Sequence, residues 1–576
     1  MCGIIGYVGN KEAYSILLKG LEKLEYRGYD SAGICTASNN QLHLQKVKGR
    51  VAGLEQFTLP GTRGISHTRW ATHGPPSDKN AHPFLDMANQ FTVVHNGIIE
   101  NYLELKEMLR QDGVQFSSDT DSEVIVHLLA KYYTGDVKEA VRQVVTMLHG
   151  AYAICVVHKD HNEIVGARNG SPLIVGVGEQ ENFLASDISA VVEHTRNVVY
   201  VNDFELVRIT PLEVQVTGFD GLMKPLEISR VHWDVQQAQK QGYKHFMLKE
   251  LHDQPAVVEE QLNVNFDIGF TPNSIHIVAC GGAGFAGVLG EYVIEHIAKM
   301  PTRFYHGSEF RYRNPIVSSN DLVLVISQSG ETADTLAAVR MAKEKGAHTL
   351  GIINVVGSTI ARECHNVIYS RAGSEVSVAS TKAFLAQIIS MYQVAYHLAG
   401  SKFTFLGYKE LIEHLLRLND RIKELAQKYF LYPNFIYIGR NRNYAIAQEG
   451  ALKLKEIAYI HAEAYHAGEL KHGPLALVSE EMPTFAICPQ DEFYAKTFSN
   501  IEEVKARSGK VITLATEGDE NITKVSDDVI YIPKVDPMLY PLLETVPVHL
   551  FAYHIADLKE CDIDKPRNLA KSVTVE

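Results

Sequence analysis

The chain has 576 residues, of which 45% are hydrophobic and 21% are charged, and its formal net charge at pH 7 is -13. This length exceeds what one hydrophobic core usually serves, and the composition is that of globular domains, which excludes fibrous, collagen-like and disordered classes. The charge is spread along the chain without a long basic block, which argues against a general role on nucleic acid or membrane surfaces.

The first part of the chain, residues 1–230, shows short strand patterns between turn signals, with helices expected near 11–24 and 121–133. This mixture favours an α+β sandwich of sheets faced by helices. The strand candidates are 91–95, 151–157 and 205–210. A polar, glutamine-rich stretch follows, and we expect residues 231–255 to form a linker.

The second part alternates strands, loops and helices, which is the pattern of a parallel sheet with crossover helices. Two such domains are expected, at 256–410 and 411–560, and matching strand spacings within them indicate an internal duplication. The strand candidates are 274–279, 322–326 and 348–354 in the first, and 434–438, 484–488 and 509–514 in the second. Residues 561–576 are expected to form an extended tail.

The seven cysteines are widely spaced without a CxxC pair, which fits a reducing compartment and argues against a disulfide framework or a zinc site. The amino terminus lacks the features of a secretory signal, so a cytoplasmic location is expected. Removal of Met1 would leave Cys2 with a free amino group of pKa near ~7.7–8.0, able to take the thiol proton. Taken alone, Cys2 is better explained as a small apolar residue starting an edge strand.

Residues farther along supply what glutamine hydrolysis needs. Arg69 and Asp121 would bind the carboxylate and ammonium groups of an amino acid. The Asn96 amide and the Gly97 N–H would form an oxyanion hole. Separately, Arg69 is as well explained by a surface ion pair, Asn96 by a turn and His73 by a loop; their co-occurrence with Cys2 favours hydrolysis.

Four motifs carry a family resemblance: Cys2 to Gly6, Tyr26 to Asp30, His67 to Gly74 and His95 to Gly97. They resemble the class II glutamine amidotransferase family, which implies an N-terminal-nucleophile fold. The resemblance implies Cys2 as nucleophile, Asn96 and Gly97 as oxyanion donors, and a glutamine site of Arg69, Trp70, Thr72, His73 and Asp121. Neither an ATP pyrophosphate loop nor a phosphoribosyl-pyrophosphate loop is found.

A hydroxyl-rich turn, Ser327 to Thr332, directly precedes a helical run. Such a turn at a helix N-terminus offers N–H groups and a favourable dipole to a phosphate. The alternative is helix capping by Ser329 or Thr332. A second such turn, Val378 to Ala383, is expected to line the same pocket.

A dinucleotide site is a competing hypothesis, because Gly282, Gly284 and Gly287 match GxGxxG and Glu309 follows about twenty residues later. Glu309 does not follow a good strand end, however, and the second repeat begins with the non-matching 439–443. The dinucleotide hypothesis therefore remains the minority interpretation.

Glu449, Lys453 and Glu456 fall within an arc of roughly 60° on a predicted helix, a pattern typical of a solvated face with an ion pair. Moving a proton between sugar carbons needs a carboxylate base, and opening the ring needs an acid such as histidine. Glu456 and His472 are the natural candidates.

These segments, with Ala379 to Phe384 and the tail Asp564 to Lys571, resemble the tandem sugar isomerase (SIS) domains of the glutamine:fructose-6-phosphate aminotransferase family, also called glucosamine-6-phosphate synthases. The resemblance implies two doubly wound α/β domains, glutamine and fructose 6-phosphate as substrates, and a homodimer. It assigns Glu456 as isomerising base beside Lys453, His472 as the ring-opening acid of the neighbouring subunit's site, Lys571 as the Schiff base and Trp70 as gate of an ammonia channel. The sugar phosphate would be held by Ser327, Gln328, Ser329, Thr332, Val378, Ser380 and Ala570.

The chain departs from the family at Gly282 and Ala283, where Thr-Ser is usual, and at Ser377, where glycine is usual. Because missing hydrogen-bonding groups discriminate strongly between substrates, an aminotransferase or deglycase acting on a different keto-sugar phosphate is the alternative. A non-enzymatic sugar-phosphate sensor is the third hypothesis. No metal constellation stands out, and the chemistry requires no cofactor.

Overall fold

The computed structural model describes residues 2–230 and 240–574. Its contacts divide the chain into two compact units. The first comprises Met1–Gln236 with Ala570–Glu576, and the second comprises Gln237–Leu569.

The first unit contains two antiparallel sheets. One has the strand order β14-β11-β9-β10-β1-β4-β2-β3, and the other has the order β13-β12-β8-β7-β6-β5. The strands of the first sheet are β1 (Gly3–Val8), β2 (Ser31–Ser38), β3 (Gln41–Lys48), β4 (Arg63–Arg69), β9 (Ile174–Val177), β10 (Asn182–Ala185), β11 (Asn197–Tyr200) and β14 (Ser229–Arg230). Those of the second are β5 (Phe84–Leu85), β6 (Phe91–Gly97), β7 (Tyr152–His158), β8 (Ile164–Asn169), β12 (Glu205–Ile209) and β13 (Val214–Gly218).

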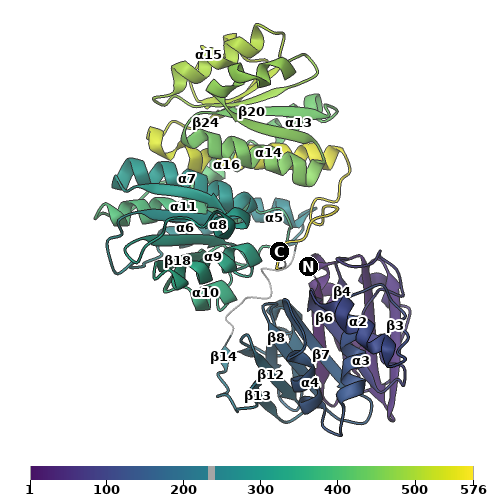
Figure 1. Cartoon of the computed structure of the whole chain (residues 1–576). Helices are drawn as coiled ribbons and strands as arrows, with labels where there is room; N and C mark the ends of the chain where they lie inside the picture. Colours follow the sequence, from purple (N-terminus) through teal and green to yellow (C-terminus); the bar gives the residue numbers. More distant parts are fainter. Residues whose placement is uncertain (1, 231–239, 575–576) are drawn as a thin grey trace. The chain divides into compact units, whose positions relative to one another are not determined.

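Three apolar clusters hold these layers together. Ile4 and Val94, from facing strands, share the cluster between the two sheets. Helix α1 (Ala13–Leu24) packs on the outer face of the first sheet, and α3 (Glu123–Tyr132) and α4 (Val137–Val145) pack on the second with α2 (Tyr102–Gln111) (Figure 1). The predicted α+β sandwich is therefore confirmed, and α1 and α3 match the two predicted helices.

The second unit contains two five-stranded parallel sheets with orders β16-β15-β17-β18-β19 and β21-β20-β22-β23-β24. In each sheet, the second strand in sequence lies at one edge, the first strand lies next to it, and the third, fourth and fifth strands follow in order. This is the doubly wound 2-1-3-4-5 order. The predicted duplication is confirmed. The strands are β15 (Ile275–Ala279), β16 (Thr302–His306), β17 (Leu322–Ser327), β18 (His348–Ile353), β19 (Asn366–Tyr369), β20 (Asn434–Gly439), β21 (His461–His466), β22 (Thr484–Cys488), β23 (Val511–Thr516) and β24 (Asp528–Ile532).

Four helices lie between these two sheets (Figure 1): α7 (Gly281–Ala298), α11 (Lys382–Leu398), α14 (Arg442–Ala458) and α16 (Tyr540–Leu558). One continuous apolar core joins them to both sheets. Apart from α5, described below, the unit also contains α6 (Gln254–Leu262), α8 (Gly307–Arg313), α9 (Ala333–Glu344), α10 (Thr359–Glu363), α12 (Tyr408–Leu416), α13 (Asn419–Tyr429) and α15 (Tyr494–Lys505). No helix in the described ranges is long and apolar enough to cross a membrane.

Part of the range predicted as a linker, 231–239, lies outside the described residues. Farther along it, α5 (Phe246–His252) buries Met247 and Leu251 in the core of the second unit. The backbone N–H groups of Phe246 and Met247 donate to the carboxylate of Asp564 at 2.9 and 3.0 Å. This helix therefore belongs structurally to the second unit.

Candidate active sites

The thiol of Cys2 lies at the start of β1, next to the end of β4. The backbone N–H of Trp70 donates to its sulfur at 3.2 Å. The carbonyl of Cys2 accepts from Arg27 Nε and from Asn96 Nδ2, each at 3.2 Å. Burial raises the pKa of the thiol, while the Trp70 N–H and the Arg69 charge act to lower it. The thiol therefore needs a base; Met1, whose removal was expected to expose that base, lies outside the described residues.

The predicted oxyanion residues end β6. Gly97 has φ +121, and a Cβ there would lie 1.9 Å from the carbonyl oxygen of Ala151, so only glycine fits. Asn96 is buried with its amide against Cys2. The structure thus brings together the predicted nucleophile and one predicted oxyanion donor.

The predicted glutamine-binding residues form a connected group. The buried guanidinium of Arg69 donates to the carbonyls of His73 and Gly74, the latter at 3.1 Å. Asp121 Oδ1 lies 3.8 Å from His73 Nδ1, and Asp121 Oδ2 accepts from the Ile99 N–H at 2.8 Å. The structure therefore brings Arg69, His73 and Asp121 together.

The other two predicted glutamine residues are neighbours in the chain. Thr72 is exposed, and its hydroxyl lies 3.3 Å from His73 Nδ1. Trp70 is half-buried and meets Tyr29 edge-on at 5.7 Å between ring centroids.

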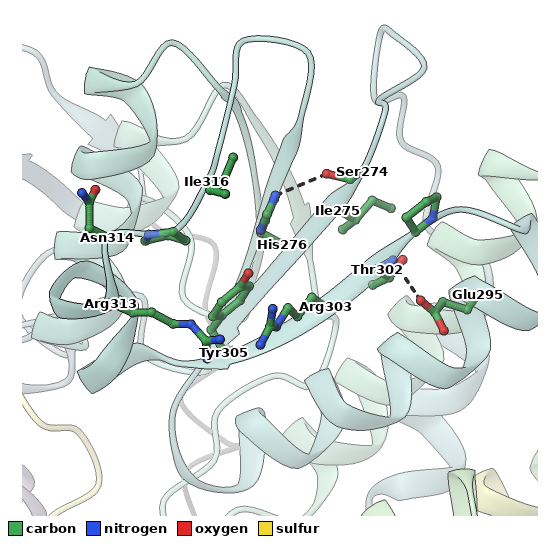
Figure 2. Close-up of a pocket in the computed structure, with 12 residues that line it drawn as sticks. Ser274, Ile275, His276, Glu295, Thr302, Arg303, Tyr305, Arg313, Asn314 and Ile316 are labelled. Carbon is green, nitrogen blue, oxygen red and sulfur yellow. Dashed lines mark hydrogen bonds between the residues drawn. The ribbon is translucent and has the colours of Figure 1, made fainter.

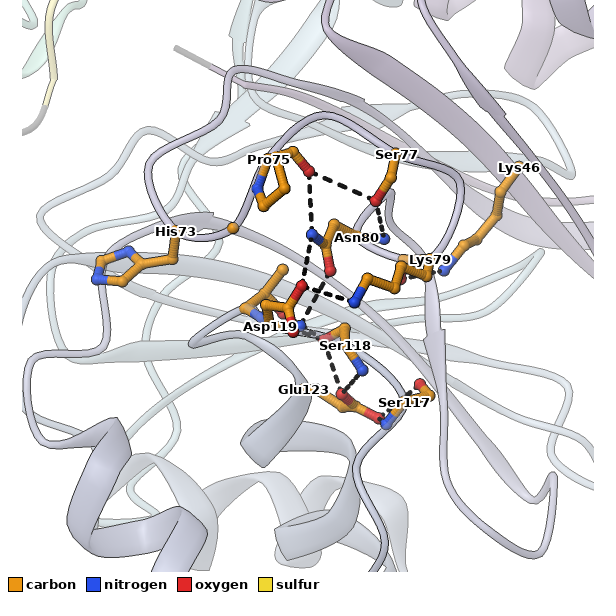
Figure 3. A network of polar contacts seen from close by, with 12 residues as sticks. Lys46, His73, Pro75, Ser77, Lys79, Asn80, Ser117, Ser118, Asp119 and Glu123 are labelled. Atoms are coloured by element: carbon orange, nitrogen blue, oxygen red, sulfur yellow. Dashed lines mark hydrogen bonds and ion pairs between the residues drawn. The ribbon is translucent and has the colours of Figure 1, made fainter.

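A polar network anchors the loop between β4 and β5 that carries these residues (Figure 3). Asn80 Nδ2 donates to the carbonyl of Pro75 at 3.0 Å and to Asp119 Oδ2 at 3.3 Å, and the Asp119 N–H donates to Asn80 Oδ1 at 2.9 Å. Lys79 pairs with Asp119 at 2.7 Å. The network ties this loop to the segment that leads into Asp121 and α3.

In the second unit, the predicted phosphate turn follows β17. Ser327 Oγ accepts from the Gly330 N–H at 3.0 Å and lies 3.1 Å from Thr332 Oγ1, while Ser329 Oγ accepts from the Glu331 N–H at 3.2 Å. Thr332 is the N-cap residue of α9, but its side chain makes no capping bond. Capping by Thr332 therefore does not explain the turn.

These hydroxyls and the half-buried Gln328 gather at the carboxyl end of β17. That edge, beside β15, is the point where the strand order reverses and where ligands bind in open α/β sheets. The second predicted turn precedes α11; Ser380 Oγ is buried without a hydrogen-bond partner among the described residues, and the Val378 N–H donates to the Asp564 carbonyl at 3.0 Å.

Ala570 and Lys571 are grouped with the first unit. Their assignment to the sugar-phosphate site therefore stays a prediction.

The charged stripe on α14 corrects the prediction of a solvated face. Glu449 and Lys453 are 0% and 1% exposed. Lys453 Nζ lies 3.3 Å from Glu449 Oε1 and 2.6 Å from Glu456 Oε2, and His549 Nε2 lies 2.9 Å from the same Glu449 oxygen. The prediction was wrong because periodicity identifies a face but not what packs on it; here α7 and α16 cover it.

The charges of this group support one another. Burial opposes the charge on Glu449, but Lys453 and His549 hold the pKa of Glu449 below its ordinary value. Burial likewise opposes the charge on Lys453, but the two carboxylates hold its pKa above the ordinary value. Glu456, 22% exposed, is the member that a ligand can reach, which fits a general base.

His472 lies apart from this group. It is exposed at the end of a 3-10 helix, Ala467–His472, that packs on α15 and β21. Within the described ranges, no hydrogen bond or ion pair joins it to Glu456.

The glycines of the GxGxxG match serve packing. A Cβ on Gly287 would lie 2.8 Å from the ring of Phe304 and 3.0 Å from Ile277, and one on Gly284 would lie 3.2 Å from Phe304. Glycine therefore lets α7 approach β15 and β16 closely. Glu309 lies within α8, beyond the end of β16. Both observations weigh against a dinucleotide site.

A pocket of about 440 Å³ opens at the amino ends of β15 and β16, opposite the phosphate turn (Figure 2). Arg303 and Arg313 converge there on the ring of Tyr305, at 5.2 and 5.6 Å from its centroid. None of the predicted site residues lines it.

Comparison with known proteins shows which family the chain belongs to. The glutamine amidotransferase domain matches residues 67–193, and the SIS domain matches residues 270–397 and 433–557. Glutamine–fructose-6-phosphate aminotransferases (isomerizing) of Thermus thermophilus and Caldanaerobacter subterraneus are 47% and 49% identical to this chain, with 100% of both chains covered. The chain belongs to this aminotransferase family. The C-terminal domain of glucosamine-fructose-6-phosphate aminotransferase from Francisella tularensis is 37% identical, covers 57% of this chain and 99% of its own length, and has a TM-score of 0.52.

Family membership confirms the resemblance drawn from the motifs and the combination of an amidotransferase domain with two SIS domains. Two residues of these sites had no assigned role in the sequence. Arg27 lies in the motif Tyr26 to Asp30. It donates a hydrogen bond to the Cys2 carbonyl and forms an ion pair with Asp187 at 3.1 Å. His549 gave no signal, because it is one of two histidines within the apolar run of α16 and no motif surrounds it.

Proposed function

We propose that the chain hydrolyses glutamine in its first unit and uses the released ammonia to convert fructose 6-phosphate to glucosamine 6-phosphate in its second. The observation that carries this proposal is the pairing, in one chain, of the half-buried Cys2, whose carbonyl accepts from the Asn96 amide, with a hydroxyl turn at a sheet switch point. The full-length aminotransferase relatives support it.

In the glutaminase step, Cys2 attacks the glutamine amide and forms a glutamyl thioester. Asn96 and Gly97 stabilise the oxyanion, and Arg69, Thr72, His73 and Asp121 bind the amino acid. Met1 removal supplies the amine that takes the thiol proton. The amine returns this proton to the amide nitrogen, which leaves as ammonia and passes through a channel gated by Trp70; water then cleaves the thioester and releases glutamate.

In the sugar step, the hydroxyls of Ser327, Ser329 and Thr332 hold the phosphate, with Gln328, Ser380, Val378 and Ala570 completing the site. Lys571 forms a Schiff base with the ketose and releases water, ammonia displaces the Lys571 amine from that carbon, and Glu456 moves the proton between C1 and C2 with Lys453 beside it. His472 opens the ring in the partner's site, so the enzyme acts as a homodimer.

The test is formation of glucosamine 6-phosphate by the purified full chain from glutamine and fructose 6-phosphate. No product at saturating substrates would reject this acceptor. A second candidate is another keto-sugar phosphate, favoured by Gly282 and Ala283, which carry no hydroxyl at the start of α7. Stimulation of glutamate release across a panel of ketose phosphates separates the two, because the true acceptor should stimulate most.

A further inference from the structure

A buried histidine lies directly beneath the predicted oxyanion residue. His67, on β4, has no exposed surface. Its Nε2 lies 3.0 Å from Asn96 Oδ1 and 3.0 Å from the carbonyl oxygen of His95. We propose that His67 is a positioning residue for the glutaminase reaction, holding the Asn96 amide so that its NH₂ group faces the nucleophile. This proposal rests on the proposed function.

The hydrogen-bond partners determine which nitrogen of His67 carries the proton. Both neighbours of Nε2 are oxygen acceptors, and the His95 carbonyl can only accept, so Nε2 must donate. The ring is neutral, because burial and the neighbouring His95 lower the pKa of His67 to about 3. A neutral ring with its proton on Nε2 has no proton on Nδ1, which has no hydrogen-bond partner among the described residues.

The same pattern fixes the orientation of the Asn96 amide. Its Nδ2 group donates to the Cys2 carbonyl at 3.2 Å, and its Oδ1 receives the His67 proton. The flipped amide would place Oδ1 against the Cys2 carbonyl and NH₂ against a donor, so two favourable contacts would become repulsive. His67 therefore selects the orientation that points a donor toward the nucleophile's residue.

The surroundings keep His67 in place. Its ring stacks on that of His82 at 4.1 Å between centroids and 11° between planes. The His95 N–H donates to His82 Nδ1 at 3.2 Å, and His95 Nδ1 pairs with Ser122 Oγ at 2.8 Å, next to Asp121. A rigid support of this kind lowers the reorganisation needed when charge develops in the transition state.

The experiment measures glutamate release by the full chain, with kcat and KM separated. His67→Ala should lower kcat by about 10- to 100-fold, while KM for glutamine should change less than about threefold. This loss in kcat is smaller than the loss expected when an oxyanion donor itself is removed. His67→Gln, whose amide N–H can donate to Asn96 Oδ1, should recover at least about a third of wild-type kcat. His158→Ala is the matched control, because His158 is 3% exposed in the same unit and has no bond to Asn96.

A double-mutant cycle with Asn96→Ala decides whether His67 acts through Asn96. The account predicts that adding His67→Ala to Asn96→Ala costs less than about twofold in kcat. If the losses in kcat of the two single variants multiply in the double variant, the proposal is overturned. It is also overturned if His67→Ala and His67→Gln lose kcat equally while both retain the wild-type unfolding midpoint. If His67→Ala does not fold, the cycle is run with His67→Phe. Absence of glutamate release by the wild-type chain would instead reject the proposed function.

Discussion

The two parallel-sheet domains of the second unit share one strand order but differ where a ligand would bind. After β17 the first domain has the turn Ser327–Thr332, with three hydroxyls. After β22 the second domain has Pro489–Glu492, with two carboxylates. Arg442, 2% exposed, pairs with Glu492 through two contacts of 2.7 Å and lies 3.8 Å from Asp491.

The difference shows how a duplicated domain divides its tasks. The switch point of the second domain is occupied by its own ion pair, whereas that of the first offers hydroxyls and helix N–H groups to an anion. The second domain instead contributes α14: Glu449 Oε2 lies 3.2 Å from where a Cβ on Gly282 would be, at the start of α7 in the first domain. The fold is retained twice, and the proposed sugar site draws residues from both copies.

The largest effect should come from breaking the ion pair of the second domain. Arg442→Ala leaves the buried Asp491 carboxylate and the exposed Glu492 carboxylate without their cation and should cost about 3–5 kcal/mol in the free energy of unfolding, mainly through Asp491. Urea denaturation measures this, with Arg340→Ala in the first domain as control. Arg340 pairs with Glu363 at 2.6 Å but is 42% exposed, so its loss should cost at most about 1 kcal/mol. Equal losses of unfolding free energy in Arg442→Ala and Arg340→Ala would contradict this distinction between the two domains.

A smaller, functional effect is expected in the first domain. The double change Ser327→Ala with Thr332→Val removes two hydroxyls that would bond a charged phosphate, worth about 1.5–3 kcal/mol. The KM for fructose 6-phosphate should rise about 10- to 100-fold with little change in stability. Gln490→Ala, in the corresponding loop of the second domain, should leave KM unchanged. A similar rise for both variants would contradict the assignment of the phosphate to the first domain.

The buried Glu544 of α16, in the second domain, should make the free energy of unfolding depend on pH. Burial, reinforced by Asp491 and opposed by Arg442, holds the pKa of Glu544 well above its ordinary value of 4.5. Above that value the unfolded chain has released this proton and the folded chain keeps it, so the contribution to stability falls as pH rises.

Glu544→Gln removes this titration. The stability of the variant relative to wild type should therefore grow by up to about 1.4 kcal/mol per pH unit above pH 4.5, until the folded pKa is reached. Urea unfolding at pH 5, 6 and 7 measures the trend. A difference that is constant across this range would show that Glu544 is ionised in the folded chain.

Much of the fold was predictable from local patterns. Short apolar runs such as 322–326 and 484–488 are strands because their residues are buried on both faces of parallel sheets. Candidate sites could be proposed from the sequence only where chemistry is concentrated in one segment, as in Ser327–Thr332. The burial of Glu449 depends on α7 and on His549, a hundred residues away, and periodicity cannot report such a partner. The contact between His67 and Asn96 likewise depends on the packing of two sheets.

In the proposed function, nitrogen travels from glutamine at Cys2 to the sugar in the second unit. The most direct measurement uses glutamine labelled with ¹⁵N at the amide, fructose 6-phosphate and mass spectrometry of the hexosamine phosphate formed. We expect labelled product from the wild-type chain and no labelled product from Cys2→Ala. Labelled product from Cys2→Ala at the wild-type rate, or unlabelled product from the wild-type chain, would contradict it.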